Sequence, residues 1–246
     1  MTRGEWYNPF FLLVETGTPV SEHITMSEPN IEFPKESKVM MIPGPAGQIE
    51  CLTAPPEADA VDKNRVALIC HPHPLYGGTM RNKVTHMLEK AFRDMGAHTV
   101  RFNFRGVGES DGVFDDGIGE AEDLLAVYEW AKTAMPHCKF WLAGFSFGSY
   151  VALRAVHQID PEQFVTVAPP VERYDYTELS APECPWLVIQ GDEDDVVSPR
   201  AVYEYVEQQN PKPQLVTMKA GHFFHRRLLD LKGAIKNGIL RQINTE

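Results

Sequence analysis

Short apolar runs without alternating polar residues recur along the chain from residue 66 onward. Such runs are typical of parallel strands that are buried on both faces of a sheet. They predict six strands, over Val66–Cys70, Thr99–Phe104, Phe140–Ala143, Phe164–Ala168, Trp186–Gln190 and Gln214–Met218.

Between these runs, apolar residues recur with the spacing of an α-helix. The spacing predicts helices over about residues 80–92 and 121–131, after Phe147, from Pro199, and from Phe223 to Ile243. Gly96 and Pro136 are placed to end the first two helices, and Ser198 is a candidate N-cap for the fourth. The alternation of strands and helices predicts an α/β fold with a doubly wound, mostly parallel sheet.

The segment before residue 66 has a different pattern. Lys38–Ile42 and Gln48–Thr53 flank a turn rich in Pro and Gly, and they predict an antiparallel pair at the N-terminal edge of the sheet. Residues 1–34 contain several prolines and no sustained periodicity, so we expect a poorly ordered arm before a single domain over 35–246. Met26 offers an alternative start, which leaves open whether residues 1–25 belong to the native product.

The formal net charge of −11 over 246 residues argues against nucleic acid or an anionic membrane as the main partner, because either would repel an acidic surface. No run approaches the roughly 20 apolar residues of a membrane span, and Phe10–Val14 is too short for a signal-peptide core. The cysteines show neither metal nor redox spacing, so we expect a reduced, cytoplasmic protein. The sequence leaves open whether it is a monomer or a homodimer.

The stretch Gly144-Phe145-Ser146-Phe147-Gly148 joins a predicted buried strand to a predicted helix. A serine with glycine at both −2 and +2 in this context is the pattern of a nucleophile elbow. The turn is tight, and a Cβ at either glycine would collide with neighbouring backbone. It raises the Ser146 hydroxyl above the sheet and leaves the Phe147 N–H, at the start of the helix, free to donate to an oxyanion.

The ends of the other strands supply further candidate chemistry, since ligands of such sheets bind beyond the carboxyl ends of the strands. His71–Gly78 is a Pro- and Gly-rich loop that can supply a second oxyanion N–H, with His73 the best donor and Leu75 the runner-up. An alternative is that His71 and His73 bind a metal, but no H-E-x-x-H motif or Cys pair completes such a site.

Three later segments also lie just beyond the ends of predicted strands. Arg105–Gly112 lacks the spacing of a phosphate-binding loop and indicates a tight turn that Arg105 anchors through hydrogen bonds. Gly191–Ser198 carries a run of acids at the position where a Ser-Asp-His enzyme needs its acid, and any Asp within 192–195 fits that place. His222 follows Gly221 and leads into the last predicted helix, where it can face Ser146.

Together these motifs resemble the α/β-hydrolase superfamily, and more narrowly the compact, lid-less bacterial serine hydrolases related to dienelactone hydrolase. That group carries a His-Pro-rich loop ending Gly-Gly-Thr-Met, an Arg-Phe-Asn-Phe-Arg-Gly-Val-Gly turn, a Gly-Phe-Ser-Phe-Gly elbow and a Gly-His-Phe-Phe-His end, here at 71–80, 101–108, 144–148 and 221–225. The resemblance covers about residue 36 to the end. It implies Ser146 as nucleophile, His222 as base and, by pattern, Asp194 as the acid. Dienelactone hydrolases themselves use Cys, so their substrate is not carried over.

The expected activity is hydrolysis of small-molecule carboxylic esters by acyl transfer, with no cofactor and no metal. Residues 169–185 are too few for a cap domain, which predicts an open site. Tyr76, Phe145 and Tyr174 are candidate pocket residues. A peptidase or thioesterase with the same triad, and a non-catalytic binding protein that retains the fold, are the alternatives.

Overall fold

The computed structural model describes residues 32–60 and 63–243. Its sheet contains eight strands: β1 (Lys38–Gly44), β2 (Gly47–Ala54), β3 (Arg65–Cys70), β4 (Ala97–Phe102), β5 (Lys139–Phe145), β6 (Gln163–Val167), β7 (Trp186–Gly191) and β8 (Gln214–Met218). Their order across the sheet is β1-β2-β4-β3-β5-β6-β7-β8. The pairs β1–β2 and β2–β4 are antiparallel and all the others are parallel, as the sequence predicts.

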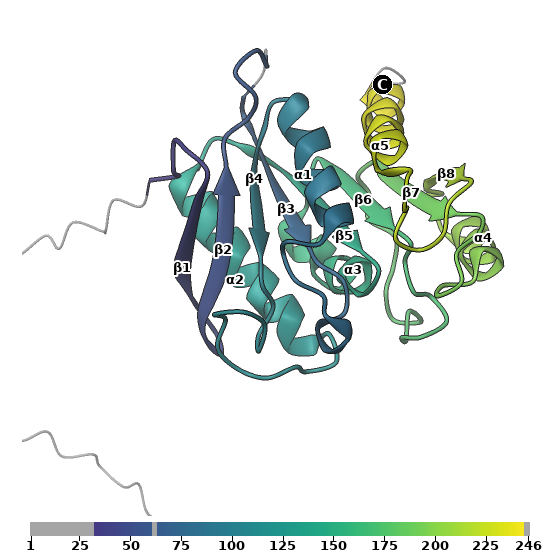
Figure 1. The fold of residues 1–246 in the computed structure, drawn as a ribbon, viewed down its shortest axis with the longest axis horizontal. Helices are drawn as coiled ribbons and strands as arrows, with labels where there is room; N and C mark the ends of the chain where they lie inside the picture. The colour runs from purple at the N-terminus through teal and green to yellow at the C-terminus, as the bar shows by residue number, and fades with distance from the viewer. Residues whose placement is uncertain (1–31, 61–62, 244–246) are drawn as a thin grey trace, which may run out of the picture. The chain divides into compact units, whose positions relative to one another are not determined.

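In the described residues, four α-helices connect strands: α1 (Lys83–Asp94), α2 (Ile118–Ala134), α3 (Phe147–Ile159) and α4 (Pro199–Gln208). A fifth, α5 (Leu228–Ile243), follows the last strand. A short 3-10 turn, η1, covers Pro74–Tyr76. Helices α1 and α5 lie together on one face of the sheet, and α2 and α3 cover the other (Figure 1). No helix in the described part of the chain is long and apolar enough to cross a membrane.

The strands are buried on both faces because each face supplies one of two hydrophobic cores. In β3, Val66 and Leu68 face the core beneath α2, α3 and α4, whereas Ala67 and Ile69 face the core beneath α1 and α5. This two-sided burial explains why the strands appear in the sequence as continuous apolar runs. It also leaves the carboxyl ends of the parallel strands as one edge where loops gather.

Element boundaries differ from the sequence-based prediction at several places. The first helix begins at Lys83 rather than near Met80, because the Asn82 side chain caps it by accepting from the Val84 N–H at 2.8 Å. The strand expected over 99–104 lies two residues earlier, at Ala97–Phe102.

The prediction that the last helix begins at Phe223 is wrong, since α5 begins at Leu228. Residues 221–227 form a turn in which Phe224 and Arg226 adopt positive φ angles of 51° and 62°. Phe224 is fully buried in the core beneath α5. Burial of this aromatic ring fixes the turn and postpones the helix by five residues.

Residues 1–31 of the predicted N-terminal arm lie outside the described residues. At its end, Phe33 is buried and packs against His98 and Trp130, with ring centroids 5.1 and 5.8 Å away. The chain is therefore joined to the core of the fold from Phe33 onward.

Candidate active site

Ser146 lies between β5 and α3 in a strained backbone conformation, with φ 53° and ψ −121°. A Cβ on Gly144 would lie 2.1 Å from the Gly148 carbonyl oxygen, and one on Gly148 would lie 2.4 Å from the Cys70 carbonyl oxygen. Both contacts are with backbone, so neither position accepts a side chain without moving the turn. Local strain of this kind persists where the surrounding structure holds it, and it presents the serine at the end of the sheet.

Ser146, His222 and Asp194 meet at the carboxyl ends of β5, β8 and β7. The Nε2 atom of His222 lies 3.1 Å from the Ser146 Oγ atom, and its Nδ1 atom lies 2.9 Å from the Asp194 Oδ2 atom. All three residues are buried, with at most 9% of their surface exposed. The structure thus joins the three residues that the motifs single out in one hydrogen-bonded line.

Every acceptor position of the Asp194 carboxylate is used. Its Oδ1 atom accepts from the backbone N–H groups of Val196 and Val197, at 2.9 and 2.8 Å. Its Oδ2 atom accepts from the Gln190 side-chain amide at 3.1 Å, besides His222. Burial alone would raise the pKa of Asp194, but the hydrogen bonds from His222 and the two backbone groups hold it below its usual value. The carboxyl group therefore stays ionised.

The other acids of the 192–195 run are placed differently. Asp192 is exposed and accepts from the Tyr203 hydroxyl at 2.6 Å, and Asp195 is exposed. The sequence motifs do not single out Gln190, which donates to Asp194, although a glutamine near the end of an apolar strand is a visible signal of a polar contact there. Of the acids in this run, Asp194 is the one that contacts His222.

The turn before α5 carries two histidines, His222 and His225, in different surroundings. His222 is buried and stacks against the ring of Phe145, with centroids 5.1 Å apart. His225 is exposed and lies before α5, whereas the predicted helix start at Phe223 places it within the helix. Phe145 has no exposed surface, so it supports His222 from below instead of lining a pocket as predicted.

The loop after β3 places two histidines in different roles. His71 is buried; its Nδ1–H donates to the Pro72 carbonyl oxygen at 2.6 Å, and its Nε2 atom accepts from the Phe104 N–H at 3.1 Å. Burial lowers the pKa of His71 to about 3, so the ring is neutral. Both ring nitrogens are used within the protein, which is the arrangement of a structural residue. In the described residues, no group of three or more His, Cys, Asp or Glu side chains could hold a metal ion.

His73 lies beside the serine. Its ring contacts Phe147 at a centroid distance of 4.9 Å, and its Nδ1 atom accepts the Leu75 N–H at 3.2 Å. That bond occupies the N–H of the runner-up oxyanion donor. Phe147 is the first residue of α3, where a backbone N–H has no partner inside the helix.

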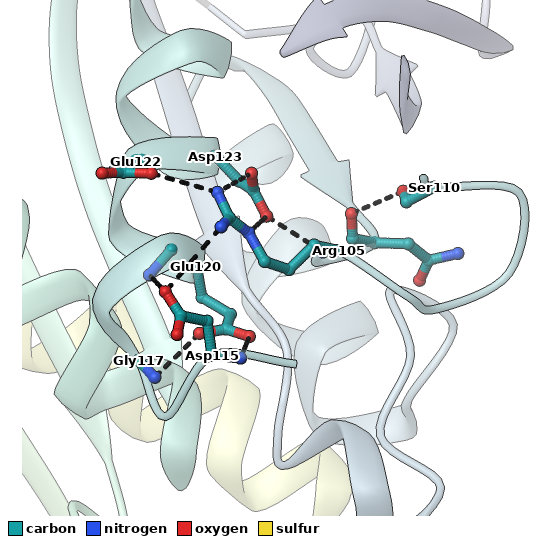
Figure 2. A network of polar contacts seen from close by, with 9 residues as sticks. Arg105, Ser110, Asp115, Gly117, Glu120, Glu122 and Asp123 are labelled. Carbon is teal, nitrogen blue, oxygen red and sulfur yellow. Dashed lines mark hydrogen bonds and ion pairs between the residues drawn. The ribbon is translucent and has the colours of Figure 1, made fainter. Parts of the chain in front are cut away.

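Arg105 anchors the turn after β4, as its sequence context indicates. Its guanidinium donates to both carboxylate oxygens of Asp123 and, at 3.3 Å, to Glu122 on α2 (Figure 2). At the other end of the turn, the Ser110 hydroxyl donates to the Asn103 carbonyl oxygen at 2.7 Å (Figure 2). These contacts fix the loop that packs Phe104 against Phe147, with ring centroids 5.8 Å apart.

Two cavities, of about 370 and 460 Å³, flank Ser146. Both are lined by His73, Tyr76, Ser146, Arg173 and Val196. The smaller, which we call the Tyr174 cavity, adds Tyr174; the larger, the Phe223 cavity, adds Phe223 and His222. Residues 168–185, which join β6 to β7, contain no helix or strand, so the described chain has no helical cap over the cavities.

A serine hydrogen-bonded to an imidazole, which is in turn hydrogen-bonded to a carboxylate, is an arrangement that can carry out acyl transfer. A family model described as X-Pro dipeptidyl-peptidase (S15 family) matches residues 52–180. An uncharacterised protein of Rickettsia prowazekii, RP471, is 34% identical over 209 residues, which are 80% of this chain and 86% of that protein.

Two solved structures are similar over nearly the whole domain. XC6422 from Xanthomonas campestris, an α/β serine hydrolase described as having no lid, has a TM-score of 0.83 and 45% identity over 85% of this chain and 96% of that one. An α/β serine hydrolase homologue from Coxiella burnetii has a TM-score of 0.80 and 42% identity over 84% and 99%. The chain belongs to the α/β-hydrolase superfamily. Within it, the chain groups with the serine hydrolases that lack a lid.

Proposed function

We propose that this protein hydrolyses small carboxylic esters by acyl transfer to Ser146. The observation that carries the proposal is the unbroken line of hydrogen bonds from Ser146 through His222 to Asp194. The positive φ of Ser146 at the end of β5 supports it, because a nucleophile elbow requires that strained turn.

In the proposed mechanism, Asp194 accepts the Nδ1–H of His222, which leaves the Nε2 lone pair directed at the Ser146 hydroxyl. His222 takes the hydroxyl proton as Ser146 Oγ attacks the ester carbonyl carbon. It then returns the proton to the alcohol oxygen as the C–O bond breaks, and an acyl-enzyme forms. Water repeats the sequence and releases the acid, with His222 again acting as base.

The N–H groups of Phe147 and His73 are the proposed oxyanion donors. Two observations support this pair. The Phe147 N–H, at the start of α3, has no partner within the helix, and the N–H of Leu75, the alternative donor, already donates to the His73 ring. Removing one such donor typically costs about 10²–10³ in turnover, so this pair would supply a large share of the catalysis.

The pocket favours small esters. Its two cavities are modest in volume, and no helical segment between β6 and β7 covers them within the described residues. Each buried CH₂ stabilises binding by about 0.8 kcal/mol only while apolar wall continues, so long acyl chains would gain little. We expect p-nitrophenyl esters of about C2 to C6 to be the best substrates.

A dipeptidyl peptidase is the second candidate, favoured by the match to the S15 family model. The matched residues 52–180 include Ser146 but neither Asp194 nor His222. A dipeptidyl peptidase binds the free ammonium of its substrate, and a carboxylate is the natural partner for that group. No Asp or Glu lines either cavity beside Ser146, whereas Arg173 lines both, so the described site favours an ester.

A substrate panel tests the proposal. The wild-type protein and Ser146→Ala are assayed with p-nitrophenyl acetate, butyrate and decanoate, an acetyl thioester and an X-Pro p-nitroanilide. We expect Ser146-dependent turnover that is highest for the short esters. A higher kcat/KM for the p-nitroanilide would establish the peptidase instead, and a higher value for the thioester would establish a thioesterase.

A further inference from the structure

The lining of the active site differs in charge from the rest of the molecule. The chain carries a formal net charge of −11, yet among the described residues no Asp or Glu lines the Tyr174 or the Phe223 cavity. Arg173 lines both cavities, as Ser146 does. A cationic group in the substrate cavity of an acidic protein marks the place where an anion is favoured.

Arg173 is held in position without being neutralised. Its Nη2 atom donates to the Val196 carbonyl oxygen at 2.7 Å, and the Val196 N–H donates in turn to the Asp194 carboxylate. This is the hydrogen bond that the Arg173 side chain makes among the described residues, and no ion pair there includes it. A guanidinium has five N–H donors, so most of them stay available to a ligand.

One acidic residue, Asp116, is close enough to affect the ionisation of Tyr174 in the cavity wall. Asp116 is exposed and lines neither cavity. Burial raises the pKa of Tyr174 to about 12, with a smaller contribution from the charge of Asp116, and the charge of Arg173 opposes this. The charges of Asp116 and Arg173 thus act in opposite directions on the Tyr174 hydroxyl, and of these two residues Arg173 is the one that lines the cavities.

We infer that Arg173 binds a carboxylate carried by the ester substrate, so that the enzyme prefers esters of dicarboxylic acids to neutral esters of the same length. This inference rests on the proposed function, because it names the substrate class of the same site. A guanidinium and a carboxylate form two parallel hydrogen bonds, which both strengthens binding and orients the ester relative to Ser146.

A matched pair of substrates tests it: p-nitrophenyl hydrogen adipate, which has a free carboxylate, and p-nitrophenyl hexanoate, which does not. The measured quantity is the ratio of their kcat/KM values. We expect the ratio to exceed one in the wild type and to fall about tenfold in Arg173→Gln, because the variant loses hydrogen bonds between two charged groups that solvent partly screens at this exposed side chain. Arg173→Lys should lie between, because it keeps the charge and loses the planar fork.

Two variants serve as controls. Lys90→Gln removes the same charge from the exposed face of α1 and should leave the ratio unchanged. Asp116→Asn should raise the ratio, because it removes the opposing charge. A ratio that is insensitive to Arg173→Gln, or that falls equally in Lys90→Gln, would overturn the inference.

A binding measurement separates this inference from the proposed function. In Ser146→Ala, which cannot form an acyl-enzyme, the monoamide of adipic acid and hexanamide are titrated and followed by NMR. Tighter binding of the monoamide that is lost in the double variant with Arg173→Gln supports the anion site even if no ester is hydrolysed. Equal binding of the two amides refutes the anion site even if esters are good substrates.

Discussion

Replacing Asp194 by Asn tests the proposed orienting role at one atom. The carboxylate accepts two hydrogen bonds on each oxygen, from Val196 and Val197 on Oδ1 and from Gln190 and His222 on Oδ2. An amide must place its NH₂ group at one of these positions. At Oδ1 it would face two backbone N–H groups, each of which would lose its acceptor at a cost of about 1–3 kcal/mol.

The amide nitrogen is therefore expected at the Oδ2 position, where both neighbours can adjust. The Gln190 Oε1 atom has no partner in the described structure, and rotation of its amide presents that atom to the new NH₂ group. His222 adjusts by moving its proton from Nδ1 to Nε2. The Nε2–H then points at Ser146, so the ring cannot accept the serine proton.

Loss of the correct tautomer costs a serine protease about 10⁴ in kcat, or about 5.5 kcal/mol of transition-state stabilisation, and we expect a loss of that order for Asp194→Asn. The urea midpoint should change little, because the hydrogen-bond count is nearly preserved. The assay is turnover of p-nitrophenyl acetate, with Asp195→Asn as the matched control on an exposed side chain. Activity of Asp194→Asn within tenfold of the wild type would refute the reasoning.

Three further predictions concern the histidines of the last turn, two glycines and His71. His222→Ala should lower turnover by several orders of magnitude and His225→Ala far less, since only His222 contacts Ser146; the reverse ranking in a kcat assay would contradict the site. Gly148→Ala should destabilise the fold by about 1–3 kcal/mol, because its Cβ would lie 2.4 Å from backbone oxygen. Gly233→Ala in α5, where a Cβ meets open space, should be neutral or stabilising in the same urea titration. The His71 pKa of about 3 lies below the ordinary value near 6.5, so between these pH values the unfolded chain binds a proton that the folded protein excludes. The free energy of unfolding should therefore fall as the pH drops from 6.5 towards 3, and this residue contributes up to about 1.4 kcal/mol per pH unit. Protonation of the His71 ring above pH 5, seen by NMR, would refute it.

The strands could be predicted from the sequence because burial on both faces forces a continuous apolar run. The strand Gln214–Met218 agrees with the prediction at both ends, and the Ser198 side chain caps α4 by accepting from the Ala201 N–H at 3.3 Å. The positions of Ser146, Asp194 and His222 could be proposed because each residue lies just beyond a strand end. Topology alone then brings them to one edge of the sheet.

Other features depend on contacts that no local pattern reveals. The late start of α5 follows from the burial of Phe224, and an apolar residue at that position fits a helix start equally well in the sequence. The prediction that Phe145 lines the pocket is wrong because its side chain is fully buried in the core beneath α1 and α5. Arg173 and Gln190 acquire their places only when the β6–β7 connection and β7 pack beside the serine.

Labelling with a fluorophosphonate probe tests the central claim most directly, because the probe reacts with a serine only when a base and an oxyanion site activate it. The wild-type protein should gain the mass of one probe less HF, because fluoride leaves as the Ser146 oxygen bonds to phosphorus, and peptide mapping should place the label on Ser146. Ser146→Ala should remain unlabelled with an unchanged circular dichroism spectrum. Labelling of Ser146→Ala at the wild-type rate, or a probe mapped to another residue such as Ser110, would contradict the account.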